Sequence, residues 1–242
     1  MDRFVLKKNK KDGRIKYMKI VAVDICGTLY SCNTTFSYLN WKYKDNNKWK
    51  CFRRLMRCMI WKILNAISVK CLNIDITRRV AISFLKGERR SEIYSDVEHF
   101  YQEVLVYRQN EEIIKKVNAF NNLEEYDVVL VSATLDCIAE VVAGHLGIKK
   151  YYASELAYLE NMCEGRIVTD YLSKKNMLFL GKHKPFVVIT DDLSDKNIID
   201  LSVEAIVVAY PSKLKKWMTL KTSCSHVIII KHNNQMEFIA NE

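Results

Sequence analysis

The sequence contains little glycine and proline and has no long run of apolar residues. Of its 242 residues, seven are Gly and two are Pro, so we expect neither a flexible linker nor a low-complexity segment. A membrane-spanning helix needs about eighteen consecutive apolar residues, and because no such stretch occurs we expect none. Residues 1–17 hold seven basic and two acidic side chains and no apolar core, which predicts a basic N-terminal extension rather than a targeting peptide.

The cysteines show neither a metal-binding nor a redox pattern. There are eight of them, and no pair has the Cys-x-x-Cys spacing. The five histidines are scattered and also lack metal-ligand spacing. We therefore expect free thiols, no zinc site and a cytoplasmic location, because a reducing compartment keeps cysteines unpaired.

Positive charge is concentrated in one part of the chain. The formal net charge is +10, which favours anionic partners such as phosphate esters, lipid head groups or nucleic acid. Residues 41–70 contain nine Lys or Arg and one acid, so the basic excess is local. Because no nucleic-acid recognition motif accompanies this excess, we expect no nucleic-acid partner.

Short buried strands alternate with helices along the chain. Apolar runs predict strands at 18–23, 127–131, 148–152, 186–189, 205–208 and 226–230. Apolar residues at helical spacing predict helices at 76–85, 91–106, 111–120 and 136–146, with a short helix starting near 173. A polar loop is expected over 31–40 and a turn at 164–166. This alternation predicts an α/β fold with a three-layer, Rossmann-like core on a parallel sheet.

The longest connection lies between the first two predicted strands. About eighty residues of helical pattern separate them, far more than a strand–helix–strand crossover needs. We therefore predict an inserted α-helical cap over 33–120, and an α/β core made of 18–32 and 121–242.

One stretch of the predicted cap is both apolar and basic. Its apolar residues recur at helical spacing, which predicts one amphipathic helix with this face: Phe52, Leu55, Met56, Met59, Ile60, Ile63, Leu64 and Ile67. Our main interpretation is that this face packs on other cap helices, while Arg53, Arg54 and Arg57 face water or substrate. The alternative is an interfacial helix on a membrane surface.

Oxygen-bearing side chains follow three of the predicted strands. Asp24 ends the first strand, Ser132 follows the second, and Asp191 follows the strand at 186–189. Because the carboxyl ends of parallel strands meet at one edge of a sheet, we expect these side chains to converge. Gly27 allows a sharp turn after Asp24, and Thr28 offers a hydroxyl and a backbone N–H to an anion. The pattern favours Asp24 as a nucleophile aimed at phosphorus beside a bound cation.

The order of these motifs resembles the haloacid dehalogenase-like superfamily, in its phosphoserine-phosphatase-like branch with a helical cap. The four motifs of that superfamily match Asp24–Thr28, Ser132, a lysine at 174 or 175, and Asp191 with Asp195. The segments at 165–167 and 210–214 also resemble this branch. The likeness covers residues 18–230.

The resemblance implies a Mg²⁺-dependent phosphohydrolase that forms an aspartyl-phosphate. It places Mg²⁺ among Asp24, the backbone carbonyl of Cys26, Asp191 and Asp195. It assigns phosphate binding to Thr28, Ser132, Ala133 and a lysine, either Lys174 or Lys175. We prefer Lys175 as the catalytic lysine, because the apolar pair at 177–178 follows at the spacing of the branch.

The substrate stays open at this point. Some relatives in the branch act on lipid phosphates, so the alternatives are a small-molecule and a lipid-linked phosphate. The second would go with a peripheral contact at the inner membrane face through the basic cap.

Position 26 departs from the pattern of these phosphatases. They usually carry a second aspartate there, as general acid for the leaving group and base for water, whereas this chain has Cys26. A thiol with a pKa near its reference value of about 8.5 is a poor donor and acceptor for that task. The alternatives are a slow phosphatase, an altered chemistry such as that of phosphonate hydrolases, or a non-catalytic protein that binds lipid or a partner through its basic cap.

Overall fold

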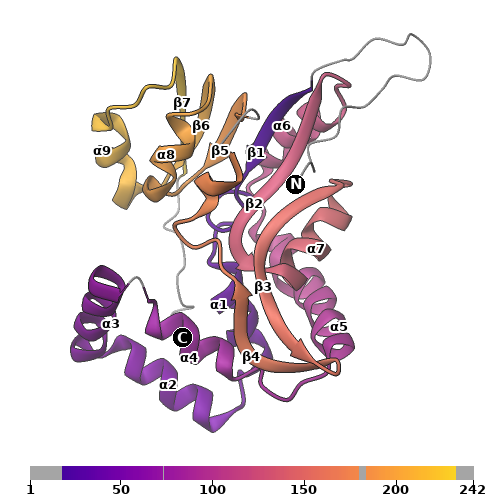
Figure 1. Cartoon of the computed structure of the whole chain (residues 1–242), viewed down its shortest axis with the longest axis vertical. Helices are drawn as coiled ribbons and strands as arrows, with labels where there is room; N and C mark the ends of the chain where they lie inside the picture. Colours follow the sequence, from indigo (N-terminus) through magenta and orange to yellow (C-terminus); the bar gives the residue numbers. More distant parts are fainter. Residues whose placement is uncertain (1–17, 73, 180–183, 233–242) are drawn as a thin grey trace.

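The strands and helices follow one another largely as the hydrophobic pattern predicts (Figure 1). The computed structural model describes residues 18–72, 74–179 and 184–232, so the predicted basic extension at 1–17 lies outside the described residues. The strands are β1 (Lys19–Val23), β2 (Tyr126–Leu135), β3 (Lys150–Leu159), β4 (Met162–Thr169), β5 (Val187–Thr190), β6 (Glu204–Ala209) and β7 (His226–Lys231). The helices are α1 (Thr34–Lys42), α2 (Asn47–Arg57), α3 (Met59–Leu72), α4 (Ile76–Ser83), α5 (Arg90–Phe100), α6 (Glu111–Asn121), α7 (Asp136–His145), α8 (Lys196–Ile199) and α9 (Pro211–Thr219).

The described strands form one sheet in the order β4-β3-β2-β1-β5-β6-β7. β1 pairs in parallel with β2 and β5, and parallel pairing continues to β3 on one side and to β6 and β7 on the other. At the edge, β4 runs antiparallel to β3. All six predicted strands occur in this sheet. β1 lies at its centre, so the residue that follows β1 lies in the middle of the sheet's carboxyl edge.

The sheet is covered on both faces, because alternate residues of each strand point to opposite sides. Val21 and Val23 of β1 belong to an apolar cluster with α5, α6 and α7. Ile20 and Ala22 belong to a second cluster, with α8 and with Trp217 of α9. This helix–sheet–helix layering confirms the predicted three-layer, Rossmann-like α/β fold.

The helices α1 to α6 lie between β1 and β2 in the chain. In Figure 1, α2, α3 and α4 form an arm below the sheet, with α3 at its outer end. By contrast, α6 packs on β2 and α5 packs on α7, and the inserted helices share the apolar cluster of the sheet. The boundaries of a separate cap at 33 and 120 therefore stay a prediction.

The polar loop predicted over 31–40 is wrong, because α1 begins at Thr34. The side chain of Asn33 accepts a hydrogen bond from the backbone N–H of Phe36 at 3.2 Å. This N-cap contact satisfies a donor that a helix start leaves open, which favours a helix in a polar segment.

The turn predicted at 164–166 is also wrong, because these residues lie inside β4. The chain reverses instead at Glu160 and Asn161, whose φ angles of 50° and 66° suit a two-residue hairpin turn. Gly165 has a φ of +70°, and a Cβ there would lie 2.8 Å from the Cβ of Lys86 and 3.1 Å from the Cα of Ser83, the last residue of α4. Glycine is therefore required for the close approach of β4 to α4, not for a turn.

The amphipathic helix predicted through 52–67 is two helices, α2 and α3, separated at Cys58. Phe52 and Met56 are buried as predicted. The remaining apolar positions are exposed, so their predicted packing on other helices is wrong: Leu55, Met59, Ile60, Ile63, Leu64 and Ile67. Periodicity detects an apolar side of a helix but does not say what covers it.

All eight cysteines lie in the described part of the chain, and none of them forms a disulfide bond there. In the described part of the chain, none of the helices combines the length and the apolar content needed to cross a bilayer.

Candidate active site

The carboxyl ends of β1, β2 and β5 meet around one cavity. Asp24 directly follows β1, Asp191 directly follows β5, and these two strands are adjacent and parallel. Ser132 lies in β2 where its pairing with β3 loses register. All three side chains line a cavity of about 150 Å³, together with Cys26 and Ala133. The structure therefore brings the predicted strand-end residues to one place.

Lys175 is buried between two carboxylates at the base of this cavity. It begins a 3₁₀ helix, and its Nζ lies 3.0 Å from Asp24 Oδ2 and 2.8 Å from Asp195 Oδ2. Burial alone would lower the pKa of Lys175, but Asp24 and Asp195 together raise it above its ordinary value. Lys174, in contrast, is exposed and lines a neighbouring cavity. Of the two candidate lysines, the structure places Lys175 beside Asp24.

Asp24 is buried where its negative charge is poorly compensated. Burial, assisted by the carboxylates of Asp195 and Asp191, raises the pKa of Asp24 to about 7, although Lys175 acts in the opposite direction. Burial likewise raises the pKa of Asp191. The backbone N–H of Ile25 donates to Asp24 Oδ1 at 2.8 Å and fixes the orientation of the carboxylate. Because burial makes the ionised forms of both carboxyl groups costly, a bound cation would stabilise them.

Asp191 is held in place by three neighbours. Lys213 Nζ donates to Asp191 Oδ2 at 2.8 Å, and the Thr28 hydroxyl donates to Asp191 Oδ1 at 3.3 Å. Gly27 has a φ of +70°, and a Cβ there would lie 2.5 Å from the Asp191 carboxyl group, so this approach requires glycine. Thr28 was predicted to bind phosphate, but it is fully buried and its backbone N–H donates to Ile25 O at 3.4 Å. Thr28 therefore supports Asp191 in this structure, and its binding of phosphate stays a prediction.

Lys213 is a site residue that the sequence analysis did not single out. It lies in α9, within the segment at 210–214 that resembles the phosphatase branch, so a signal was present. Its partner Asp191 lies at the end of β5, and Lys213 also lines the cavity.

Cys26 is joined to a chain of hydroxyl groups. Its Sγ lies 2.9 Å from Thr34 Oγ1, and Thr34 Oγ1 lies 2.7 Å from Thr134 Oγ1. Burial, with a smaller effect of the Asp24 carboxylate, raises the pKa of the Cys26 thiol. The thiol is therefore protonated near neutral pH.

Arg78 links the inserted helices to the sheet at the rim of the cavity. This buried residue of α4 donates from Nη1 to Asp170 Oδ1 at 2.6 Å and from Nη2 to the backbone carbonyl of Ala133 at 2.5 Å. Asp170 also accepts from Ser154 Oγ at 3.0 Å. The arginine thus fixes the carbonyl next to Ser132. Nothing in the spacing of the sequence distinguishes Arg78 from the neighbouring arginine, which explains why it was missed.

The predicted cation site rests on two carboxylates. Among the described residues, no group of three or more His, Cys, Asp or Glu side chains is arranged to hold a metal ion. Asp195, a predicted ligand, turns its Oδ2 to Lys175 at 2.8 Å and to Thr190 Oγ1 at 2.7 Å. Asp24 and Asp191 remain as oxygen donors beside the Cys26 backbone. Mg²⁺ commonly binds proteins through one or two carboxylates plus water and substrate oxygens, so the donor chemistry fits Mg²⁺.

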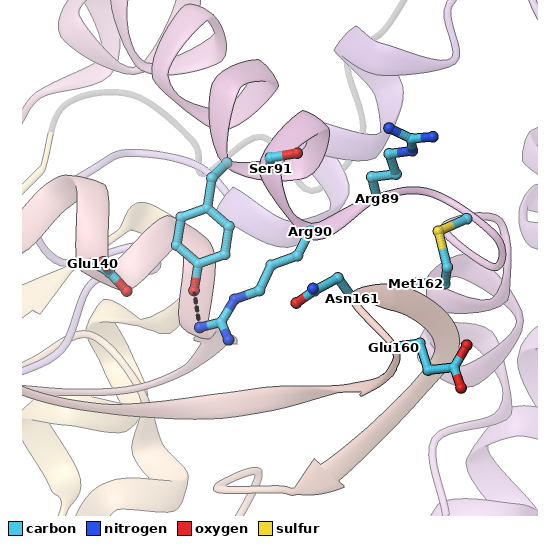
Figure 2. A pocket seen from close by; sticks show the side chains of 8 residues that line it. Arg89, Arg90, Ser91, Glu140, Glu160, Asn161 and Met162 are labelled. Carbon is cyan, nitrogen blue, oxygen red and sulfur yellow. Dashed lines mark hydrogen bonds between the residues drawn. The ribbon is translucent and has the colours of Figure 1, made fainter.

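A larger hollow of about 760 Å³ lies elsewhere, between the start of α5 and the β3–β4 turn (Figure 2). Figure 2 shows Arg90 reaching the hydroxyl of a tyrosine ring, while Arg89 and Glu160 lie apart from it. Arg90 Nη2 donates to Tyr94 Oη at 3.4 Å. This hollow is remote from the strand ends and lacks the buried acid–lysine cluster, so we place the candidate active site at Asp24.

No family model and no curated protein matches the sequence. Among solved structures, a protein of unknown function from Bordetella pertussis Tohama I matches with a TM-score of 0.68 at 13% identity, covering 88% of this chain and 99% of that one. A cytosolic 5'-nucleotidase IIIB bound to cytidine matches with a TM-score of 0.57 at 13% identity, covering 88% and 80%. A phosphoserine phosphatase solved as an analogue of its phospho-aspartyl intermediate matches with a TM-score of 0.52 at 16% identity, covering 88% and 94%. At these identities the likeness shows a shared fold.

Proposed function

We propose that this chain, which has the fold of the haloacid dehalogenase-like phosphatases, is a phosphohydrolase that uses Asp24 as its nucleophile. Its substrate would be a small-molecule or lipid-linked phosphate monoester. The observation that carries the proposal is the buried Asp24 carboxylate at the end of the central strand, 3.0 Å from Lys175 and in one cavity with Ser132 and Asp191.

The residues around Asp24 can each take a part in phosphoryl transfer. Ser132 Oγ and the backbone N–H of Ala133 would donate to phosphoryl oxygens, and Lys175 would neutralise a further oxygen. Asp24 attacks phosphorus in line as the bond to the leaving oxygen breaks, giving an aspartyl-phosphate. Water then attacks this phosphorus, which releases phosphate and restores Asp24. Asp195 keeps Lys175 charged and in place.

Asp24, Asp191 and the backbone carbonyl of Cys26 would hold Mg²⁺, with Asp195 supporting them through Lys175. A bound Mg²⁺ would offset the repulsion between the phosphate dianion and the carboxylates. The raised pKa values of Asp24 and Asp191 support this assignment, because burial makes their ionised forms costly and a bound cation would offset that cost. Lys213, which pairs with Asp191 Oδ2, would have to share that carboxylate.

Cys26 limits the chemistry that we expect. Because burial raises the pKa of its thiol, Cys26 holds its proton near neutral pH and cannot serve as the base that activates water. We therefore propose slow turnover, with a preference for esters whose leaving group needs no protonation. The same residue favours the second candidate, a non-catalytic protein or one of altered chemistry that binds phosphate at this site without hydrolysing monoesters.

The test is hydrolysis of p-nitrophenyl phosphate and a panel of alkyl phosphates with and without Mg²⁺. We expect Mg²⁺-dependent release of phosphate that falls to background in Asp24→Asn. The matched control is Asp45→Asn, at an exposed position between α1 and α2, which should keep the wild-type rate. Activity that survives in Asp24→Asn would overturn the mechanism. Thermal stabilisation by a phosphate analogue such as vanadate, without turnover of any ester, would overturn the hydrolase in favour of the second candidate.

A further inference from the structure

Helix α3 turns polar side chains towards the protein and apolar side chains towards solvent, the opposite of an ordinary surface helix. The side chains that it turns to the protein are Trp61, Asn65 and Ser68. Its large aliphatic side chains and methionine are instead between 42% and 71% exposed: Met59, Ile60, Ile63, Leu64, Ile67, Val69 and Leu72. An apolar patch of this kind on a soluble domain marks a surface that meets another apolar body.

The reversed orientation is fixed by hydrogen bonds to α4. Trp61 Nε1 donates to Thr77 Oγ1 at 2.8 Å, and the Thr77 backbone N–H donates to Asn65 Oδ1 at 3.0 Å. Trp61 also packs edge-on against the buried ring of Phe52, with the ring centroids 6.1 Å apart. Turning α3 over to bury its aliphatic side would break all three contacts. The exposure of this side is therefore built into the fold.

The same surface is uniformly basic. Residues 46–74 contain seven Lys or Arg and no acid. Six of these cations are exposed on α2 and α3: Lys48, Lys50, Arg54, Arg57, Lys62 and Lys70. A second copy of this chain would bring an equally basic face to the contact, so like charges oppose a symmetric dimer through α3. An anionic surface is the complement, since basic side chains and an apolar helix face together are typical of interfacial helices.

We infer that α3, with the exposed cations of α2 and α3, is a docking surface for an anionic phospholipid bilayer. The helix lies in the plane of the membrane with its aliphatic side chains among the acyl chains near the head groups. Its 14 residues are too few to span a bilayer, so the contact is peripheral. The inference does not depend on catalysis at Asp24.

The experiment is flotation of the full-length protein with vesicles of phosphatidylcholine, with and without phosphatidylglycerol. On α3 we compare Ile60→Gln/Ile63→Gln, which removes apolar contacts, and Lys62→Glu/Lys70→Glu, which reverses charge. The matched controls lie on α9, where Met218, Lys215 and Lys216 are also exposed: Met218→Gln and Lys215→Glu/Lys216→Glu. The basic segment 1–17 is unchanged in every variant, so a loss is assigned to α3.

We expect the wild type to float with phosphatidylglycerol vesicles, to be released by salt, and to remain unbound with phosphatidylcholine alone. Each α3 variant should lower the partition coefficient by roughly tenfold or more, and the α9 variants should leave it unchanged. Circular dichroism melting checks that the variants stay folded. Equal binding to both kinds of vesicle, no binding, or α3 variants that float like the wild type would overturn the inference. Sedimentation that shows a dimer disrupted by the α3 variants would assign the surface to a second copy instead.

Discussion

At the scale of single residues, the proposed site has groups that could bind an anion, but position 26 offers it no acid or base for proton transfer near neutral pH. Asp24, Ser132 and Lys175 line one cavity, while position 26 carries a protonated thiol. The thiol is held by Thr34 Oγ1 at 2.9 Å and lies beside Asp24. In the proposed mechanism, position 26 therefore does not supply a group that both gives a proton to the leaving oxygen and takes one from water.

We predict that Cys26→Asp raises turnover of alkyl phosphates. A carboxyl group at this position can protonate the leaving oxygen and later accept a proton from water, and such help is typically worth 10²–10⁴-fold. Aryl phosphates should gain less, because their leaving groups need little protonation. Steady-state kinetics on the two ester classes measures the difference.

The control for this change is Cys26→Ser, which keeps a group able to bond Thr34 but adds no titratable acid. Its rate should stay near that of the wild type. If Cys26→Asp gave no gain, or a loss, the thiol would have a dedicated role of its own, and the altered-chemistry candidate would be favoured.

At the scale of elements, the sequence predicted the strands well because their signal is local. The runs that become β1, β5 and β6 are short, apolar and placed before acids or turns, and each is buried on both faces as such runs should be. The site residues at the strand ends followed, because parallel strands share one carboxyl edge. The choice between Lys174 and Lys175 depended on a spacing rule. In the structure Lys175 is buried and Lys174 is exposed, and the catalytic role of Lys175 stays a proposal.

Features that depend on contacts distant in sequence could not be predicted. Arg78 reaches the carbonyl of Ala133 across 55 positions, and no local pattern encodes that contact. Helix α1 depended on one cap contact of Asn33. For α3, periodicity identified an apolar side, but the hydrogen bonds of Thr77 decide which side faces the protein.

The contact between α4 and the sheet predicts a pH-dependent contribution to stability. Burial alone would raise the pKa of Asp170, but Arg78 outweighs it and lowers the pKa below its ordinary value. A carboxylate whose pKa is lowered in the folded state stabilises that state. The stabilisation is fully present above the unfolded pKa of about 3.9 and is lost as the pH falls through the pKa of the folded state. Asp170→Asn keeps an oxygen for Ser154 but removes the charge. We expect it to cost about 1 kcal/mol at neutral pH, because the Asp170 side chain is 40% exposed and partly screened.

Urea unfolding measured from neutral pH downwards tests this expectation, and the gap between wild type and Asp170→Asn should close below about pH 4. The matched control is Glu164→Gln, which removes the partner of Arg166 in an ion pair at 2.7 Å that is more exposed. That change should stay within about 0.5 kcal/mol of the wild type. A gap for Asp170→Asn that is unchanged at low pH would mean that the ion pair contributes nothing.

At the scale of the whole molecule, the two signs of charge are separated. The chain is strongly basic overall, with its excess in 41–70, whereas the carboxyl edge of the sheet gathers Asp24, Asp191 and Asp195 around Lys175 and Lys213. The basic arm and the acidic site are connected through α4. Thr77 of α4 accepts a hydrogen bond from Trp61 of α3, and Arg78 of α4 donates one to the backbone carbonyl of Ala133. An anionic surface and a divalent cation would therefore bind at two places that are connected through α4.

The carboxylates at the strand ends predict how Mg²⁺ should affect the stability of the folded protein. The pKa of Asp24 is raised to about 7 without a cation, so protonated Asp24 contributes to the free energy of unfolding. This contribution is fully present below the unfolded pKa of about 3.9 and is lost as the pH rises from there to about 7. Mg²⁺ binds the ionised carboxylates and competes with the proton, so its apparent affinity should fall roughly tenfold per pH unit below 7 for each proton released. We expect the rise in melting temperature at millimolar Mg²⁺ to be larger at about pH 8 than at about pH 5.

The variant Asp24→Asn/Asp191→Asn separates this site from weak binding elsewhere on the surface. It removes both proposed carboxylate ligands, and because it also breaks the Lys175–Asp24 and Lys213–Asp191 ion pairs, the protein without metal should be less stable than the wild type near pH 8. Its melting temperature should not respond to Mg²⁺ at either pH. A Mg²⁺ response that persists in this variant, or one that is equal at both pH values in the wild type, would place the cation away from Asp24. The surplus of negative charge at the strand ends would then be balanced by Lys175 and Lys213 alone.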